Sequence, residues 1–211
     1  MSLELFNFRY SVYGWIVRMV LEEKGLAYEA HAVNPFSTPL PEGYLDLHPF
    51  GRVPVLRHDG FTIYETVAIT GYLDDAFNGP MLQPADARSR ARMRQIISIA
   101  DNYAYIPLVR QVFSHRVFRS AMNEAADEKI VAEGLAAAVR ILDALENLLA
   151  SEGFAAGPQF SLADAHLGAM MGYFTMADEG AHMIASRPKL DRWWQRMAEW
   201  PSLVKTRPSL A

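Results

Sequence analysis

Three places along the chain combine residue types that could hold a charged ligand. Ser11 precedes an apolar-periodic segment, where a hydroxyl and the positive end of a helix both stabilise a neighbouring anion. Glu65 and Thr66 begin another helical pattern and offer a carboxylate, a hydroxyl and helix N-terminal amides. Pro54 opens a strand-like run although proline cannot donate a ladder hydrogen bond, so the peptide is cis or the strand is broken there. Plain helix capping remains the alternative role for Ser11 and Glu65.

The composition excludes several other kinds of chemistry. The 211 residues include no cysteine, which rules out a protein thiol nucleophile, CxxC redox chemistry, a disulfide and a thiolate zinc site. No two of the six histidines have the three- or four-residue spacing that places metal ligands on one helix face, so we expect no metal. A net charge of −4 argues against nucleic acid or anionic membranes as partners.

The hydrophobic pattern predicts a soluble, cytoplasmic protein. Hydrophobic residues make up 51% of the chain, enough to bury a core. There is no uncharged apolar run of membrane-spanning length, and residues 1–7 lead directly into a strand-like pattern instead of a secretory leader.

The first part of the chain alternates between strand and helix patterns. Residues 3–8 and 28–33 alternate as strands, residues 12–24 between them have helical spacing, and this order predicts a βαβ unit. Two short strands are predicted over 52–56 and 61–64, separated by His58-Asp59-Gly60. A helix from Glu65 onward is predicted to bury a continuous stripe of Ile69, Tyr72, Leu73, Ala76 and Phe77.

The second part of the chain shows no clear strand. Residues 78–84 break all periodicity, and we predict a first domain over 1–78, a linker over 79–86 and an all-helical domain over 87–211. A long helix over 86–113 should kink at Pro107. A second helix is predicted along an apolar seam formed by Leu135, Ala138, Leu142, Leu145 and Leu149. A third is predicted to begin at Ser161, which can cap it together with Asp164, and a last helix is predicted around 190–200.

Four motifs in this order resemble the soluble glutathione transferase family over nearly the whole chain. They are the opening helix SVYGWIVRMVLEEKG, the loop HPFGRVPVL, the pair Glu65-Thr66 and the helix start Ser161-Leu162-Ala163-Asp164. The loop is similar to the family's Asn-Pro-x-Gly-x-Val-Pro segment with its cis-proline, with His48 in place of asparagine. Thr66 replaces the family's serine, and residues 12–14 lack the second serine and cysteine of zeta-like classes, so the class is left open.

The resemblance implies an α/β plus all-α fold. A thioredoxin-like glutathione-binding domain (βαβ-ββα) would precede a C-terminal helical bundle that holds the second substrate. The implied protein is a serine-type glutathione S-transferase, which transfers alkyl or aryl groups in detoxification with glutathione as co-substrate. A homodimer built along the third and fourth helices is implied as well.

On this resemblance Ser11 is the catalytic residue that favours the glutathione thiolate. Lowering a thiol pKa from near 8.5 by about two units requires roughly 2.7 kcal/mol, within reach of one charge-assisted hydrogen bond plus a helix end. Tyr10 and Tyr13 carry rival hydroxyls, although we interpret both as aromatic walls of the substrate pocket.

The remaining glutathione contacts follow from the same resemblance. The backbone of Val53, before Pro54, is expected to pair with the cysteinyl amide, and Arg52 with the glycyl carboxylate. Glu65 is expected to bind the γ-glutamyl ammonium, and Thr66 the neighbouring carboxylate.

The electrophile is expected between the first-domain loop and the kinked helix. Candidate walls of its pocket are Phe8, Tyr10, Tyr13, Tyr103, Tyr105, Phe113 and Arg116. Aromatic residues at helical spacing are more often core, so we expect at least half of those on the helix to be core. Arg110 and Arg116 near the kink indicate an anionic or polarised electrophile.

Two alternatives remain at this point. A glutathione-dependent isomerase of the zeta-like, maleylacetoacetate isomerase type would use the same thiolate. A non-catalytic glutathione-transferase-like interaction module would keep the fold and lose the ligand residues, which this sequence retains. Thiol-disulfide exchange through a protein cysteine is excluded by composition.

Overall fold

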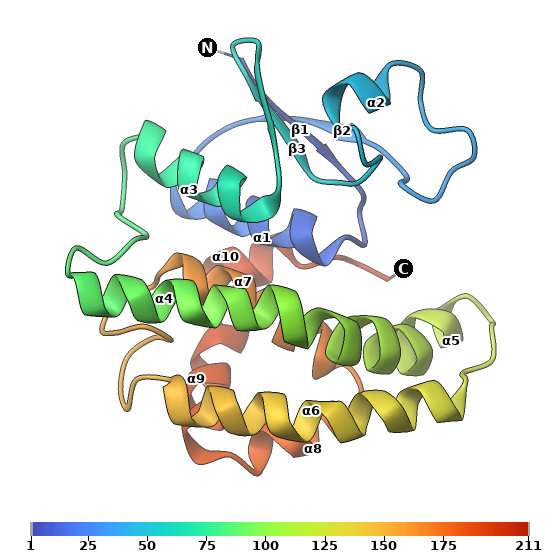
Figure 1. Ribbon diagram of the computed structural model, residues 1–211, viewed down its shortest axis with the longest axis vertical. Coiled ribbons are helices and arrows are strands. Elements are labelled where there is room, and N and C mark those ends of the chain that lie inside the picture. Colours follow the sequence, from blue (N-terminus) through green and yellow to red (C-terminus); the bar gives the residue numbers. More distant parts are fainter. Residues whose placement is uncertain (1, 211) are drawn as a thin grey trace. The chain divides into compact units, whose positions relative to one another are not determined.

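The computed structural model describes residues 2–210, and the chain forms two compact units (Figure 1). One unit comprises the chain up to Pro80 together with Lys205–Ser209, and the other comprises Met81–Val204 with Leu210. The first unit is α/β and the second is helical, which confirms the predicted fold class. The boundaries 1–78, 79–86 and 87–211 stay predictions.

The first unit is built on a four-stranded sheet of order β2-β1-β3-β4. Strand β1 pairs in parallel with β2, and the other neighbours pair antiparallel. Parallel β1 and β2 joined through a helix form the predicted βαβ unit. The elements in chain order are β1 Leu3–Asn7, α1 Val12–Glu23, β2 Glu29–Ala32, α2 Tyr44–Leu47, β3 Val55–His58, β4 Phe61–Tyr64 and α3 Thr66–Ala76.

Alternation along β1 decides which face of the sheet is covered. Leu3 and Leu5 are buried, whereas Glu4 and Phe6 on the opposite face are partly exposed. Helices α1 and α3 pack against each other on one side of the sheet (Figure 1). On the other side, Tyr44 of α2 joins Val33 and Val55 in a smaller apolar cluster. This cluster supports the loop that leads to β3.

The strand predicted over 52–56 was misplaced. Strand β3 begins at Val55, directly after Pro54, and continues through His58. His58 pairs with Phe61, so the turn contains only Asp59 and Gly60, both with positive φ (47° and 87°). Because Pro54 has no N–H to donate, the ladder begins after it.

The predicted apolar stripe of α3 was only partly right. Ile69 and Leu73 are fully buried, Tyr72 and Phe77 are partly exposed, and Ala76 is exposed. The helix ends at Ala76, and Asp74 instead points inward to a buried ion pair with Lys24, whose Nζ lies 3.2 Å from Asp74 Oδ1. The sequence did not predict this buried charged pair, which lies next to Leu73 of the stripe in the chain.

The second unit is a bundle of helices. In chain order they are α4 Ala87–Ile99, η1 Ala100–Phe118, α5 Arg119–Ala121, α6 Glu128–Leu148, α7 Leu162–Phe174, α8 Asp178–Ala185, α9 Pro188–Ala198 and α10 Pro201–Thr206. Every residue of α7 is buried, so this helix forms the centre of the unit. Of the predicted α6 seam, Leu135 is only partly buried, and the other four members are buried. Helices α8 and α10 were not predicted.

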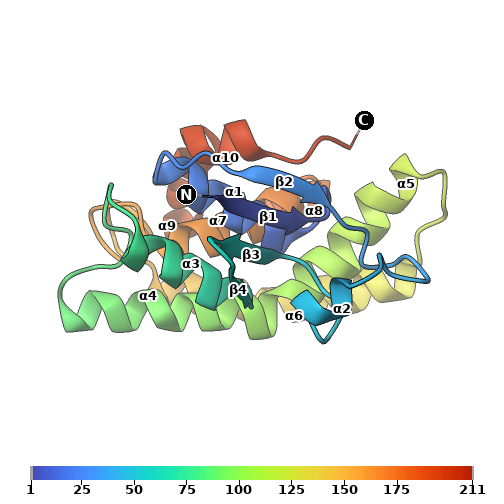
Figure 2. The same cartoon turned by 90° about the horizontal axis from the view of Figure 1, so that it is seen from above.

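The long helix after the linker changes its hydrogen-bonding pattern. Helices α4, η1 and α5 follow one another without a break (Figure 2). The η1 segment is a π-helix that contains Pro107, but it begins at Ala100. The change in hydrogen bonding therefore begins seven residues before Pro107, and the kink at Pro107 stays a prediction.

The predicted Ser161 cap is confirmed as a capping box with Asp164. Asp164 is fully buried, and its carboxylate accepts from the Ser161 N–H (2.9 Å) and from the Ser161 hydroxyl (2.8 Å). The same carboxylate accepts from Ala155 N and from Trp193 Nε1. Burial raises the pKa of Asp164, and these four donors oppose the rise.

Within residues 2–210, no helix has both the length and the apolar character needed to cross a membrane.

Candidate active site

Ser11 caps α1 and keeps part of its hydrogen-bonding capacity. Its Oγ accepts from Gly14 N at 3.1 Å, and its backbone is extended (φ −71°, ψ 120°). A Cβ at Gly14 would lie 1.6 Å from Asn7 Oδ1, so glycine permits the end of β1 to pack against this first turn. Among the described residues, the Ser11 hydroxyl has no acceptor for its proton. The hydroxyl can therefore donate to an anion beside the start of α1.

The two rival hydroxyls lie in different surroundings. Tyr10 Oη accepts from Arg9, whose guanidinium carbon also lies 4.3 Å from the Tyr10 ring centroid. Phe8 packs edge-on against Tyr10, with ring centroids 5.4 Å apart. Tyr13 is partly buried in the first turn of α1. Phe8 and Tyr10 thus form an aromatic group next to Ser11 in the chain, and their role as pocket walls stays a prediction.

The loop before β3 contains a residue, Val53, whose backbone polar groups are unpaired among the described residues. The Val53-Pro54 peptide is cis, as predicted. Within residues 2–210, the N–H and C=O groups of Val53 form no hydrogen bond. The side chain of Arg52 is exposed and has no partner within the same part of the chain, so its charge is available.

A buried tyrosine that the sequence did not single out fixes this loop. Tyr44 is 3% exposed, and its hydroxyl donates to the carbonyl oxygen of Arg52 at 2.6 Å. Burial raises the pKa of Tyr44 to about 12, which keeps the donor protonated. Tyrosine on a one-turn helix carried no periodic signal, so only the fold reveals this contact.

The start of α3 lacks a side-chain cap. Glu65 precedes the helix with φ +71°, a left-handed value that costs a non-glycine residue about 1–3 kcal/mol. Its exposed carboxylate forms no hydrogen bond or ion pair with the described residues. Thr66 is 7% exposed, and its hydroxyl is likewise unpaired within residues 2–210. A helix start with unused N–H donors, a hydroxyl and a carboxylate matches a ligand that carries both charges.

The second unit uses two of its predicted pocket residues elsewhere. Phe113 is 4% exposed and packs on Tyr173 with ring centroids 4.2 Å apart, so it belongs to the core. Arg116 donates to Glu128 and Glu179 at 2.6 and 2.7 Å, and these hydrogen bonds raise its pKa. Its charge is therefore neutralised within the unit, contrary to the predicted role in binding an anion. Tyr103 is 64% exposed, and Tyr105 is partly exposed.

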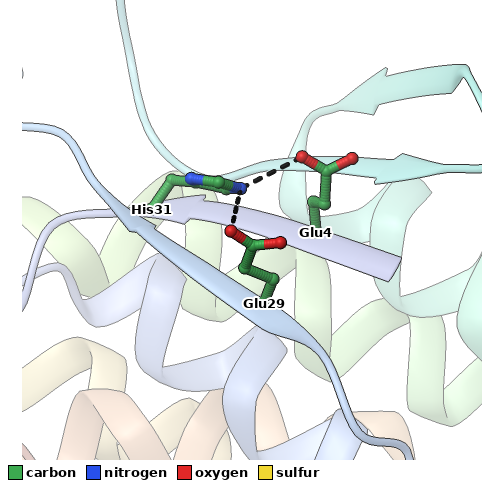
Figure 3. A group of neighbouring side chains, drawn as sticks. All are labelled: Glu4, Glu29 and His31. Atoms are coloured by element: carbon green, nitrogen blue, oxygen red, sulfur yellow. Dashed lines mark hydrogen bonds and ion pairs between the residues drawn. The ribbon is translucent and has the colours of Figure 1, made fainter. Parts of the chain in front are cut away.

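The fold also brings together a polar cluster that the sequence did not predict (Figure 3). His31 Nε2 lies 3.0 Å from Glu4 Oε2 and 3.7 Å from Glu29 Oε1, a grouping of possible metal ligands on neighbouring strands. Arg57 donates two hydrogen bonds to Glu4 (3.0 and 2.6 Å), and this contact lowers the pKa of Glu4. The Glu4 carboxylate is thus already engaged by the Arg57 ion pair and by the His31 contact, and the expectation of no metal stays a prediction.

Comparisons with known proteins cover both units. A family model described as glutathione S-transferase, N-terminal domain, matches residues 5–81, and one described as glutathione S-transferase, C-terminal domain, matches residues 97–201. Glutathione S-transferase F13 of Arabidopsis thaliana is 29% identical over 100% of this chain and 97% of its own length. Glutathione S-transferase 3 of Zea mays is 31% identical over 90% of this chain and 86% of its own length.

A solved structure supports the same relationship. The apo form of glutathione S-transferase III superposes with a TM-score of 0.86 at 27% identity, covering 100% of this chain and 97% of that one. Both units, in the same order, thus have counterparts in one family, and the chain belongs to the glutathione S-transferase family.

Proposed function

We propose that this glutathione transferase activates the glutathione thiol through Ser11 for attack on a small electrophile. The observation that carries the proposal is that the Ser11 hydroxyl accepts one hydrogen bond and donates none to a described residue. Gly14 N–H occupies its acceptor side, whereas no described residue takes its proton. A sulfur anion beside the start of α1 would accept that proton as a hydrogen bond.

The chemical step then requires little from the protein beyond this stabilisation. Ser11 and the N-terminal end of α1 favour the thiolate, and the thiol proton leaves to solvent. The sulfur electron pair forms a C–S bond to the electrophilic carbon. A leaving group departs with its bonding pair, or an activated double bond takes up a proton.

The groups left unused in the first unit match glutathione in charge and type. We assign the Val53 backbone, before cis-Pro54, to the cysteinyl amide and Arg52 to the glycyl carboxylate. The unpaired Glu65 carboxylate suits the γ-glutamyl ammonium, and Thr66 at the start of α3 suits its carboxylate. Glutathione would thereby satisfy donors and acceptors that the protein leaves open.

Further assignments concern the electrophile, assembly and location. We assign Phe8, Tyr10 and Tyr13, which lie close to Ser11 in the chain, to electrophile binding. A homodimer is supported by exposed apolar side chains on each unit, at Val67 of α3 (51%) and Ile106 of η1 (54%). Cytoplasmic location is part of the same proposal.

Titration of glutathione by isothermal calorimetry, with ultraviolet detection of bound thiolate, tests this assignment. Wild type should bind with a thiolate signal, Glu65→Ala should bind more weakly, and Ser11→Ala should bind without thiolate. Absence of binding by wild type would leave the non-catalytic interaction module. Binding of thiolate by Ser11→Ala would move the role to another donor, with Tyr13→Phe as the next variant.

A further inference from the structure

His48 is a buried side chain at the entrance to the loop that presents Val53. It is 2% exposed, and its ring stacks on Tyr64 with centroids 4.6 Å apart and planes 30° apart. Phe50 packs edge-on against the same ring at 6.0 Å. These contacts fix the orientation of the imidazole, and the function proposed above gives it no role.

The imidazole forms a specific hydrogen bond to the loop backbone. His48 Nδ1 accepts from Phe50 N at 3.3 Å. Since both nitrogens of an imidazolium are donors, this bond exists only when Nδ1 carries no proton. The following residue, Gly51, has a φ of +62°, and its N–H donates to the carbonyl oxygen of His48 at 2.9 Å. His48 thus binds the backbone at the start of the turn, and the Tyr44 hydroxyl binds the carbonyl oxygen of Arg52 at its end.

The surroundings favour the neutral ring near pH 7. Burial lowers the pKa of His48 from its ordinary value of 6.5; the Glu65 carboxylate opposes this, and the Arg52 charge adds to it. The titratable or charged groups that act on the ring are Tyr64, which stacks on it, and Glu65 and Arg52 through their charges. Protonation therefore occurs below pH 6.5 and places an Nδ1–H donor against the Phe50 N–H donor.

We propose that His48 is a positioning residue that makes glutathione binding sensitive to pH. The neutral ring holds the Phe50–Val53 turn in the geometry that presents the Val53 backbone, and the protonated ring releases it. This inference rests on the proposed glutathione site. An asparagine, which the family usually carries here, can accept the same N–H two residues on but does not titrate.

The test compares glutathione affinity at about pH 7, 6 and 5 in wild type, His48→Asn and His48→Leu, each checked for folding by thermal unfolding. Glutathione itself changes little in charge over this range, since its carboxyls titrate near 3.5 and its thiol near 8.5. Wild type should lose about two- to tenfold in affinity toward pH 5, the equivalent of one hydrogen bond. His48→Asn should keep the affinity of wild type at pH 7 with a flat profile. His48→Leu should bind weakly at every pH.

Parallel pH profiles in wild type and His48→Asn, or a flat profile in wild type, would overturn the inference and leave the glutathione site standing. No binding by wild type at any pH would remove the site itself, and the inference with it. Nitrogen NMR of wild type provides a test that needs no variant. A protonated Nδ1 at pH 7 would contradict the proposal, and an unprotonated Nδ1 that gains its proton together with the loss of affinity would support it.

Discussion

Two serines, Ser11 and Ser161, begin helices in the two units, yet they differ in what they leave unused. Ser161 is 2% exposed, and its hydroxyl donates to the buried Asp164, so its proton is already engaged inside the second unit. Ser11 is partly exposed and accepts from Gly14 N, and its proton has no acceptor among residues 2–210. The same residue type at the same kind of position serves stability in one case and keeps a donor for ligand in the other.

The neighbours of each serine produce this difference. An aspartate three residues after Ser161 closes the capping box, whereas Gly14 stands three residues after Ser11 and has no side chain to return. A cap is therefore a functional candidate only when its hydroxyl proton is unpaired.

The largest expected effect is the loss of stability when the capping box of Ser161 and Asp164 is disrupted. Asp164→Asn turns one carboxylate oxygen into an NH₂ donor that faces donors, and it should lower the free energy of unfolding by about 3–5 kcal/mol. Chemical denaturation of wild type and variant measures this loss. Glutathione affinity of the folded fraction should stay unchanged; a loss below about 1 kcal/mol would mean that the Asp164 network contributes little.

The next effect is the loss of catalytic rate when the hydroxyl of Ser11 is removed. Ser11→Ala should lower kcat/KM by about 10- to 100-fold, since one hydrogen bond to a charged sulfur is lost, while glutathione affinity changes little. Steady-state kinetics with a chromogenic aryl halide, together with thiolate absorbance, measures it. Ser11→Thr retains a hydroxyl and should retain most of the rate. Equal losses in both variants would indicate a packing role for Ser11.

The matched substitution at the other cap should have the opposite profile. Ser161→Ala should lower the free energy of unfolding by about 1–2 kcal/mol and leave the thiolate signal intact. Thermal unfolding and ultraviolet absorbance on the same samples separate the two effects. A lost thiolate signal in the folded Ser161→Ala variant would refute the contrast between the two serines.

The smallest effect compares two acidic residues at helix starts. Glu65→Gln removes a charge that forms no ion pair with a described residue and should weaken glutathione binding about three- to tenfold without lowering the thermal midpoint. Asp86→Asn is the control, because Asp86 already accepts from Arg88 N and Ser89 N as the cap of α4. Calorimetric titration should show unchanged affinity in that control; equal weakening in both would point to a general charge effect.

The sequence predicted much of the fold because its local signals are strong. Asp59 and Gly60, predicted to separate two strands, form the turn with φ of 47° and 87°, and the Ser161-Asp164 box forms as its spacing indicated. The sequence analysis failed at two points. It did not indicate that Asp74 is buried in an ion pair with Lys24, and the strand predicted over 52–56 begins only at Val55 because Pro54 cannot donate to the ladder.

The candidate site shows the same division. Ser11, the Val53-Pro54 peptide and the Glu65-Thr66 pair became candidates through their positions at helix or strand starts together with the resemblance to the glutathione transferase family. The sequence did not show that Arg116 is neutralised by Glu128 and Glu179, because those partners lie 12 and 63 residues away along the chain. The sequence also did not show that Tyr44 and His48 form hydrogen bonds with the backbone of the loop before β3.

The sequence by itself therefore determined the residue types available, the absence of any cysteine and the order of the elements, because these follow from composition and short-range periodicity. The tertiary structure decided which polar groups are paired and which remain unused. Hydrogen bonds between distant segments depend on register and packing, which no local pattern encodes. The hydroxyl of Ser11 is available to a ligand only because the folded chain brings no acceptor to it within residues 2–210.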